Sequence, residues 1–199
     1  MISQIYNTSL SLLTDLYQLT MAYGYFKAGI ADRQAVFHLF YRRQPFKGNY
    51  AIACGLEYAI DYIQNLRFTP SDLDYIATLV GADKKPLFDE DFLHYLAAFR
   101  PTCNIEAIPE GTVVFPHEPL VRVQASLLEA QLLETPLLNI INFQTLVATK
   151  SARICQAAQP DGVLEFGLRR AQGVDGGLSA SRAAFIGGCV ATSNVLAGK

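Results

Sequence analysis

Two adjacent arginines follow a short apolar run near the carboxyl-terminal end of the chain. Arg169 and Arg170 come directly after the segment "VLEFGL", residues 163–168. A guanidinium group keeps its positive charge and presents forked N–H donors that match phosphate and carboxylate groups. In β/α architectures, groups that act on substrates lie where strands end at their carboxyl side. Two interpretations stand at this point: an anion-binding site, or surface arginines that form salt bridges and contact water.

A second apolar run, residues 189–192, ends in a similar way with Ser193 and Asn194. Between the two runs, the segment "VDGGLS", residues 174–179, is predicted to be a bare loop that leads into a helix. Backbone N–H groups at the start of a helix favour bound anions. This loop is therefore consistent with the anion-binding interpretation of the arginines.

The first third of the chain holds a second group of cations and an aromatic candidate. Arg42 and Arg43, with Lys47 nearby, follow a predicted strand and form either a cationic cluster or a guard against edge-to-edge strand pairing. Tyr17 lies on a predicted helix, where it serves either to stack on a ligand or to pack in the core. The three histidines have no serine or cysteine partner at a recognisable spacing, so no nucleophilic triad is predicted.

The elements that position these residues are predicted from the spacing of apolar residues. Residues 12–26 follow a helical period, with Thr14 or Asp15 placed to cap the first turn. A strand is predicted over 35–43, followed by a short strand that runs into an amphipathic helix and then by another helix that opens near Pro70. Two or three short strands follow up to residue 126. Residues 1–125 are therefore interpreted as an N-terminal α+β domain.

A buried connecting helix is predicted within residues 126–160, with Thr135 as its N-cap and Pro136 as its first residue. Residues 161–199 then alternate strand, helix, strand and helix, which is typical of the start of a (β/α) barrel. The two strands, at 163–167 and 189–192, are expected to be parallel neighbours. A barrel of this kind takes about 250 residues, so the chain is expected to stop inside this domain.

The composition limits the possible classes of function. The chain has 199 residues, 51% of them hydrophobic, and a formal net charge of -2, which argues against general binding to nucleic acid or to an anionic membrane. The four cysteines lie far apart and are expected to be reduced thiols that hold no zinc. Polar residues interrupt the apolar segment 127–148, and the first residues lack the features of a signal peptide. We therefore expect a cytoplasmic protein.

Several stretches together resemble one enzyme family over nearly the whole chain. They are "LLTDLYQLTMAYGYF", "FHLFYRRQPFKGNYAIACGLEYAIDYI", "LLETPLLNIINFQTLVATKSAR", "LEFGLRRAQGVDGGLSAS" and "TSNVLAG". These motifs are similar to those of the nicotinate phosphoribosyltransferases, which are type II phosphoribosyltransferases. "GLRRAQGVDGGLSAS" is specific to that family, whereas "TDLYQ" is shared with nicotinamide-using relatives.

The resemblance implies an activity and an assembly. Members of the family join nicotinate to 5-phosphoribosyl 1-pyrophosphate, giving nicotinate mononucleotide and pyrophosphate. ATP hydrolysis is coupled to this reaction, and Mg²⁺ accompanies phosphoribosyl pyrophosphate and ATP. The implied fold is an N-terminal α/β domain followed by an irregular α/β barrel, in a homodimer whose active sites lie between subunits. The histidine that family members phosphorylate is expected beyond residue 199, so this chain is expected to be an inactive fragment.

The resemblance also implies a role for each candidate residue. Phe166 matches a ring that packs on one face of the pyridine, and Tyr17 matches the tyrosine that the partner subunit places on the other face. Arg169 matches an arginine near the substrate carboxyl or phosphate. The groups implied for phosphoribosyl pyrophosphate are Asp15, Arg42, Arg169 and Asn194. No protein nucleophile is implied, because the residues bind and orient the reactants.

Ser193 bears on the choice of substrate. The nicotinamide-using relatives, which this segment also resembles, have an aspartate at the corresponding position. An aspartate there would repel the carboxylate of nicotinate. Serine at this position favours nicotinate, although it is also suited to cap the helix that follows. The alternatives that stay open are a nicotinamide-using relative and a non-catalytic assembly partner. A quinolinate-using enzyme is less favoured, because two carboxylates would need more cations.

Overall fold

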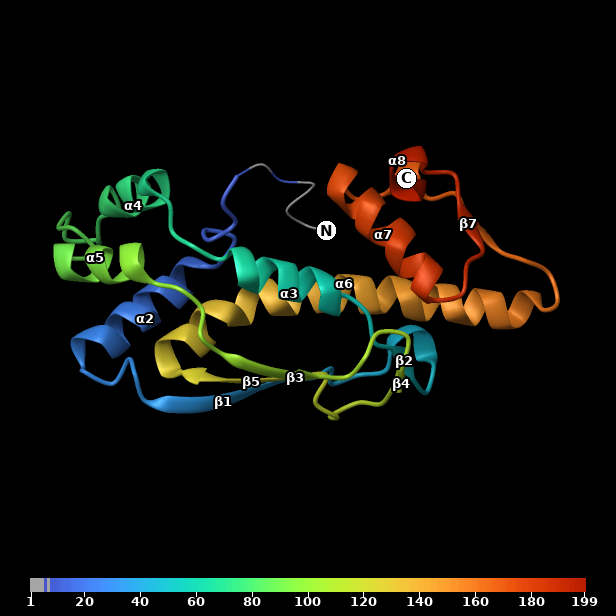
Figure 1. The fold of residues 1–199 in the computed structure, drawn as a ribbon, viewed down its shortest axis with the longest axis horizontal. Coiled ribbons are helices and arrows are strands. Elements are labelled where there is room, and N and C mark those ends of the chain that lie inside the picture. The colour runs from blue at the N-terminus through green and yellow to red at the C-terminus, as the bar shows by residue number, and fades with distance from the viewer. Residues whose placement is uncertain (1–5, 7) are drawn as a thin grey trace. The chain divides into compact units, whose positions relative to one another are not determined.

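The computed structural model describes residue 6 and residues 8–199, and it confirms the predicted mixture of helices and strands (Figure 1). The chain forms two compact units, each built from separate segments. The first unit comprises Met1–Phe37, Glu57–Ile105 and Arg122–Leu137, and the second comprises His38–Leu56, Glu106–Val121 and Leu138–Lys199. The domain ranges 1–125, 126–160 and 161–199 stay a prediction.

The α-helices are α2 (Leu16–Lys27), α3 (Leu56–Asn65), α4 (Pro70–Ala77), α5 (Glu90–Ala98), α6 (Leu127–Ala158), α7 (Val174–Ile186) and α8 (Val195–Gly198). In the first unit, rings from α2 and α5 form an aromatic cluster. The ring of Phe92 lies 5.1 Å from that of Tyr23 and 5.5 Å from that of Phe26, measured between centroids. At the start of α4, Thr69 and Asp72 form a capping box, in which each side chain accepts a hydrogen bond from the main chain of the other.

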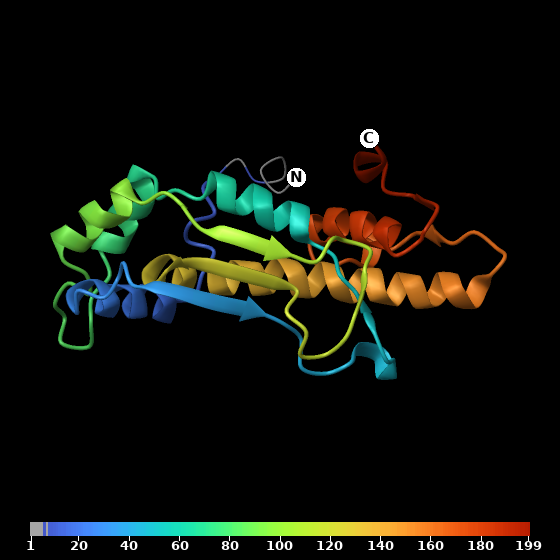
Figure 2. The same ribbon diagram turned by 60° about the horizontal axis from the view of Figure 1, so that its bottom comes forward.

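The strands are β1 (Gln34–Leu39), β2 (Ala51–Ile52), β3 (Asn104–Ala107), β4 (Val113–Val114), β5 (Val121–Ser126), β6 (Leu164–Glu165) and β7 (Ala191–Thr192). Three of them form a sheet in the order β1-β5-β3, whose arrows are clear in Figure 2. Strands β2 and β4 pair antiparallel, and β6 and β7 pair parallel. The predicted parallel neighbours at 163–167 and 189–192 are therefore confirmed, although the paired segments are shorter than expected.

The start of α6 differs from the prediction. The helix begins at Leu127, directly after β5, and Pro136 lies inside it instead of at its first position. Ser126 caps this earlier start, because its side-chain oxygen accepts a hydrogen bond from the N–H of Glu129 at 3.3 Å. The assignment of Thr135 as the N-cap was wrong, since the helix had already formed before the Thr-Pro pair.

Two other predicted boundaries also moved. Helix α2 begins at Leu16, and Asp15 occupies its N-cap position without a side-chain capping hydrogen bond. The strand predicted over 35–43 ends at Leu39, and the short 3-10 turn η1 (Pro45–Lys47) follows. The carbonyls of Leu39 and Tyr41 accept hydrogen bonds from the N–H groups of Leu120 and His117, which belong to the segment before β5, so the regular strand pairing ends here. Arg42 and Arg43 consequently lie in a connecting segment and not at the end of a strand.

In the second unit, side chains of α6 complete the hydrogen bonding of the β2 segment. The hydroxyl of Thr149 accepts from the N–H of Ile52 at 2.9 Å, and that of Thr145 accepts from the N–H of Cys54 at 3.2 Å. Since unpaired main-chain groups are costly when buried, these threonines explain how a two-residue strand is held against a helix. Helix α7 packs on the same part of α6, where Ala148 and Ala183 are both buried beside Ile52.

Within the part of the chain that the structure describes, no helix combines the length and the apolar character that a membrane crossing requires.

Candidate functional site

The carboxyl ends of β6 and β7 lie side by side. Leu164 is paired with Ala191 and Glu165 with Thr192, so the residues that follow each strand leave the sheet at the same edge. The N–H of Ser193 continues the pairing by donating to the carbonyl of Glu165 at 2.9 Å. The loop after β6 and the loop after β7 are therefore brought together, as the sequence predicted.

The candidate residues after β6 are open to solvent. The side chain of Phe166 is 63% exposed. Arg169 and Arg170 form the end of the 3-10 turn η2 (Leu168–Arg170), and both are exposed. An exposed ring and an exposed guanidinium group within one short segment are suited to a planar, anionic ligand, because the ring offers a stacking surface and the cation neutralises charge.

Helix α7 begins earlier than the sequence predicted. The segment "VDGGLS" is not a loop: it forms the first turns of α7, which starts at Val174 after Gly173 with a φ of 86°. Gly177 within these turns is buried, and a Cβ there would lie 2.7 Å from Cδ1 of Leu168. The glycine therefore lets the turn with the two arginines pack closely on the helix, which is a packing role that the sequence analysis did not assign.

Glu165 organises this edge, and the sequence analysis missed it. Its carboxylate accepts hydrogen bonds from the hydroxyl of Ser181 at 2.8 Å, from that of Thr192 at 2.6 Å and from the N–H of Gly167. Burial alone would raise the pKa of this carboxyl group, but the three donors outweigh burial and lower the pKa. The carboxylate thus ties α7 and β7 to the turn after β6. The sequence did contain a hint: Glu165 is the one acid in the apolar run "VLEF", and a carboxylate in such a run must find hydrogen-bond donors nearby.

The two polar residues after β7 have different environments. Ser193 is exposed, whereas Asn194 is buried. Asn194 caps α8, because its side-chain oxygen accepts from the N–H of Ala197 at 3.3 Å, and its amide nitrogen faces the carbonyl of Gly177 at 3.5 Å. The helix cap is therefore Asn194, and the alternative in which Ser193 caps the helix was wrong. Ser193 leaves its side chain at the open edge.

The other candidates lie elsewhere in the chain. Asp15 and Tyr17 belong to the first unit, where Asp15 is exposed and the side chain of Tyr17 is 50% exposed. Arg42 is exposed in the second unit, between β1 and η1. The proposed binding roles of these three residues, and those of Phe166, Arg169, Ser193 and Asn194, stay predictions.

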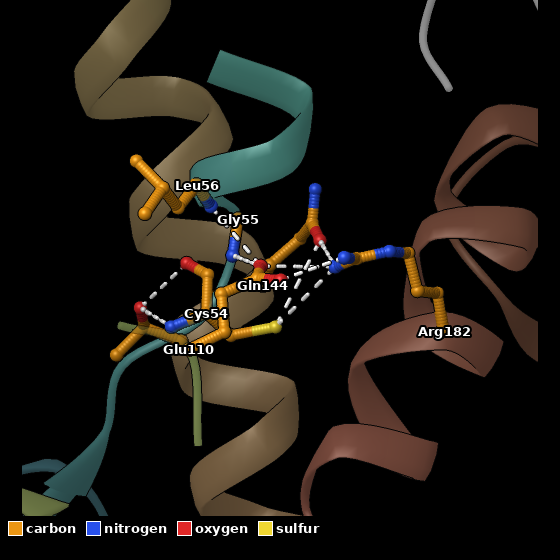
Figure 3. A network of polar contacts seen from close by, with 7 residues as sticks. Cys54, Gly55, Leu56, Glu110, Gln144 and Arg182 are labelled. Atoms are coloured by element: carbon orange, nitrogen blue, oxygen red, sulfur yellow. Dashed lines mark hydrogen bonds and ion pairs between the residues drawn. The ribbon is translucent and has the colours of Figure 1, made fainter. Parts of the chain in front are cut away.

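A second polar network in the same unit was also missed (Figure 3). The carboxylate of Glu110 accepts from the N–H groups of Gly55 and Leu56 at 2.5 and 3.0 Å, at the start of α3. It also forms an ion pair with the guanidinium group of Arg182 on α7 at 2.6 Å. Gly55 has a φ of 104° and faces α6 so closely that a Cβ would lie 3.0 Å from the carbonyl oxygen of Ile140, which explains why glycine occupies this turn.

This network also sets the protonation states of its members. Burial favours the neutral carboxyl group of Glu110, but the bonds from Arg182 and Gly55 outweigh burial and lower its pKa. Burial raises the pKa of the nearby Cys54 thiol to about 12, and the negative charge of Glu110 adds to the effect. The thiol is therefore neutral at ordinary pH, and we assign it a packing role.

Among residues 6 and 8–199, no group of three or more histidine, cysteine, aspartate or glutamate side chains is arranged to hold a metal ion.

Comparison with known proteins identifies relatives over most of the chain. The family model described as the nicotinate phosphoribosyltransferase (NAPRTase) N-terminal domain matches residues 12–142. The chain is 50% identical to the nicotinate phosphoribosyltransferase of Bacillus subtilis, over 96% of this chain and 38% of that protein. It is 46% identical to the enzyme of the same name from Caenorhabditis elegans, over 94% of this chain and 33% of that protein.

Among solved structures, the crystal structure of human nicotinic acid phosphoribosyltransferase aligns with a TM-score of 0.85 at 45% identity. This alignment covers 93% of the present chain and 37% of the human one. The chain therefore spans between 33% and 38% of the length of these relatives.

Proposed function

Because the chain belongs to the nicotinate phosphoribosyltransferase family, we propose that it supplies the N-terminal part of an enzyme that joins nicotinate to 5-phosphoribosyl 1-pyrophosphate. The products are nicotinate mononucleotide and pyrophosphate, ATP hydrolysis is coupled to the reaction, and the setting is NAD salvage in the cytoplasm. The observation that carries the proposal is the parallel β6–β7 edge, which gathers an exposed ring, an exposed arginine and an exposed serine at one place.

Each residue at this edge has a chemical role in the proposal. Phe166 packs on one face of the pyridine, and Arg169 faces the substrate carboxylate or phosphate through its forked donors. Ser193 donates a hydrogen bond to the carboxylate. Asn194 is buried and holds the start of α8, and in the proposal it contributes to the part of the site that binds phosphoribosyl pyrophosphate.

Residues of a partner subunit complete the proposed site. In a homodimer with shared active sites, Tyr17 of one subunit covers the other face of the pyridine bound by its partner. Asp15 and Arg42 face the phosphoribosyl pyrophosphate bound there. Such sharing would explain why residues that resemble one binding site belong to different compact units of the chain.

The reaction displaces pyrophosphate from the anomeric carbon of the ribose, and positive charge develops on the sugar in the transition state. The side chains at the edge bind and orient the reactants, and the cationic groups stabilise the departing anion. Mg²⁺ would accompany the two phosphate-bearing substrates. No protein nucleophile takes part in this scheme.

The exposed apolar residues of the second unit support a larger barrel in the natural protein. A parallel strand pair is normally covered on both faces, because its crossover helices pack on the sheet. Here the exposed large apolar side chains include Leu164, Phe185, Val190, Val195 and Leu196. We propose that further strands and helices of an irregular α/β barrel cover them.

The test uses the natural protein and follows its Ser193→Asp variant. We expect the wild type to form nicotinate mononucleotide and to prefer nicotinate over nicotinamide. The variant should lower kcat/KM for nicotinate, relative to that for nicotinamide, by about tenfold or more, because two negative charges would face each other at the site. Ser71→Asp, at an exposed position of α4, tests whether any added charge has this effect. Equal preferences in wild type and Ser193→Asp would contradict the assigned role of Ser193, and absence of product from nicotinate would contradict the proposed function.

A further inference from the structure

The polar residues of α6 that interrupt its apolar pattern include Gln131, Glu134 and Thr135. They lie beside α2 in the first unit, where they surround the side chain of Gln18. The amide nitrogen of Gln18 donates to the carboxylate of Glu134 at 2.9 Å and to the hydroxyl of Thr135 at 3.1 Å. The carbonyl oxygen of Gln18 accepts from the amide nitrogen of Gln131. Both ends of the Gln18 amide are thus held by one helix.

Gln18 also contacts its neighbour in the sequence. Its amide nitrogen also lies within hydrogen-bond distance of the hydroxyl oxygen of Tyr17, at 3.0 Å, so its two N–H groups are shared among three acceptors: Glu134, Thr135 and Tyr17. The side chain of Gln18 is fully buried, whereas that of Tyr17 is half exposed. The tyrosine ring is therefore anchored through its hydroxyl to a buried group, while part of its surface is left open.

An amide fixed by several partners is a rigid anchor, because moving it would leave buried polar groups unsatisfied. A ring held in this way loses little conformational entropy when a flat ligand stacks on it, so the anchoring increases affinity by pre-organisation. Without the anchor, the tyrosine side chain would sample other rotamers.

We propose that Gln18 is a positioning residue, which orients the ring of Tyr17 for stacking on the flat pyridine of nicotinate. This inference rests on the proposed function, since it assumes that Tyr17 covers the substrate ring. It assigns to Glu134, Thr135 and Gln131 the task of holding Gln18. The carboxylate of Glu134 is the strongest acceptor in the group, because it is charged.

The experiment compares four variants of the natural protein: Tyr17→Ala, Tyr17→Phe, Gln18→Leu and the double variant Tyr17→Phe/Gln18→Leu. The dissociation constant of nicotinate is measured by calorimetry, and kcat and both KM values are measured at steady state. Tyr25→Phe is the matched control, because it removes a hydroxyl from the same helix. Tyr17→Phe keeps the half-exposed ring and removes only the anchored hydroxyl, so it reports on the proposal even if Gln18→Leu folds poorly.

We expect Tyr17→Phe and Gln18→Leu each to weaken nicotinate binding by about three- to tenfold, which is the effect of one lost hydrogen bond. The KM for phosphoribosyl pyrophosphate should stay within about twofold, as should every constant of Tyr25→Phe. The double variant should bind nicotinate no more weakly than Gln18→Leu, because the two side chains act through one contact.

The outcomes separate this inference from the proposed function. If Tyr17→Ala weakens nicotinate binding and Tyr17→Phe does not, the ring binds substrate without the anchor, and the positioning role is overturned. Additive effects in the double variant, or an equal rise in both KM values for Gln18→Leu, would overturn it as well. If Tyr17→Ala leaves nicotinate binding unchanged, the proposed role of Tyr17 fails and the inference fails with it.

Discussion

Glu110 and Glu165 are two partly buried carboxylates of the second unit that hold main-chain turns in different ways. Glu110 accepts from two N–H groups and from the charged guanidinium group of Arg182. The partners of Glu165 are all neutral: one N–H group and the hydroxyls of Ser181 and Thr192. Losing Glu110 therefore removes an ion pair with a cation, whereas losing Glu165 removes hydrogen bonds to neutral donors only.

Glu110 and Glu165 also differ in where they lie relative to the candidate site. Glu110 follows β3, and its carboxylate joins the start of α3 to Arg182 on α7, among buried residues such as Cys54 and Gln144 (Figure 3). Glu165 directly precedes the exposed Phe166 at the candidate site. The pKa of both carboxyl groups is lowered, but their partners and positions differ. We therefore expect Glu110 to matter most for stability and Glu165 most for activity.

The largest effect is expected for Glu110→Gln in the natural protein. The change removes the ion pair between Glu110 and Arg182, and we expect the free energy of unfolding to fall by about 2–3 kcal/mol, which is below the value for a fully buried pair because Arg182 is partly exposed. Urea denaturation measures this change. Asp161→Asn, which makes the same chemical change on an exposed loop, should cost less than about 0.5 kcal/mol. If both variants lost the same free energy of unfolding, the special contribution of Glu110 to stability would be contradicted.

A smaller loss of stability is expected for Glu165→Gln, about 1–2 kcal/mol, because no ion pair is lost. The amide has one acceptor oxygen for three donors, so the turn that carries Phe166 and Arg169 should shift. We expect kcat/KM for nicotinate to fall by about tenfold, since small misplacements of binding groups reduce rates strongly. Steady-state kinetics of both glutamate variants give the test. If Glu110→Gln reduces kcat/KM more than Glu165→Gln does, the assignment of separate tasks is wrong.

The sequence predicted well what depends on local pattern. The parallel β6 and β7 pair followed from two apolar runs separated by a helix, α2 and α3 followed from the spacing of their apolar residues, and α4 followed from the proline at its start. The start of α6 was missed, although "SLLE" at residues 126–129 is a capping pattern. Thr135 and Pro136 are also typical of a helix start, so the sequence offered two possible starts for α6. Local pattern does not choose between them, and in the structure the helix begins at the earlier one, directly after β5.

The organising groups of the two networks could not be predicted in the same way. Glu110 and Arg182 are separated by 72 positions in the sequence, and no periodicity links them. Gln18 and Glu134 are separated by 116 positions. Such pairs arise from tertiary packing, in which a buried polar group must find whichever partner the fold brings near. Sequence analysis proposed residues whose types suit a ligand, and it missed Glu165, Glu110 and Gln18, which hold the surrounding structure together.

The smallest expected effect concerns acid pH. The pKa of Glu165 is lowered in the folded protein from its ordinary value of 4.5, so the unfolded chain binds more protons in this range. The carboxylate therefore stabilises the fold above pH 4.5, and the contribution is lost as the pH falls from there through the lowered folded pKa. Other carboxyl groups, such as that of Asp72, also have a lowered pKa, so the acid sensitivity of the wild type alone is not informative.

The informative quantity is the difference in free energy of unfolding between wild type and Glu165→Gln, measured by urea denaturation between about pH 7 and pH 3. We expect this difference to be constant above about pH 5.5 and to shrink as the pH falls, because protonation turns the wild-type group into a neutral one that resembles the amide. Glu110→Gln should show the same trend, with a larger difference at neutral pH because its carboxylate faces a cation. A difference that stays constant down to pH 3 would mean that the charge of the carboxylate contributes nothing, and that its shape alone holds the turn.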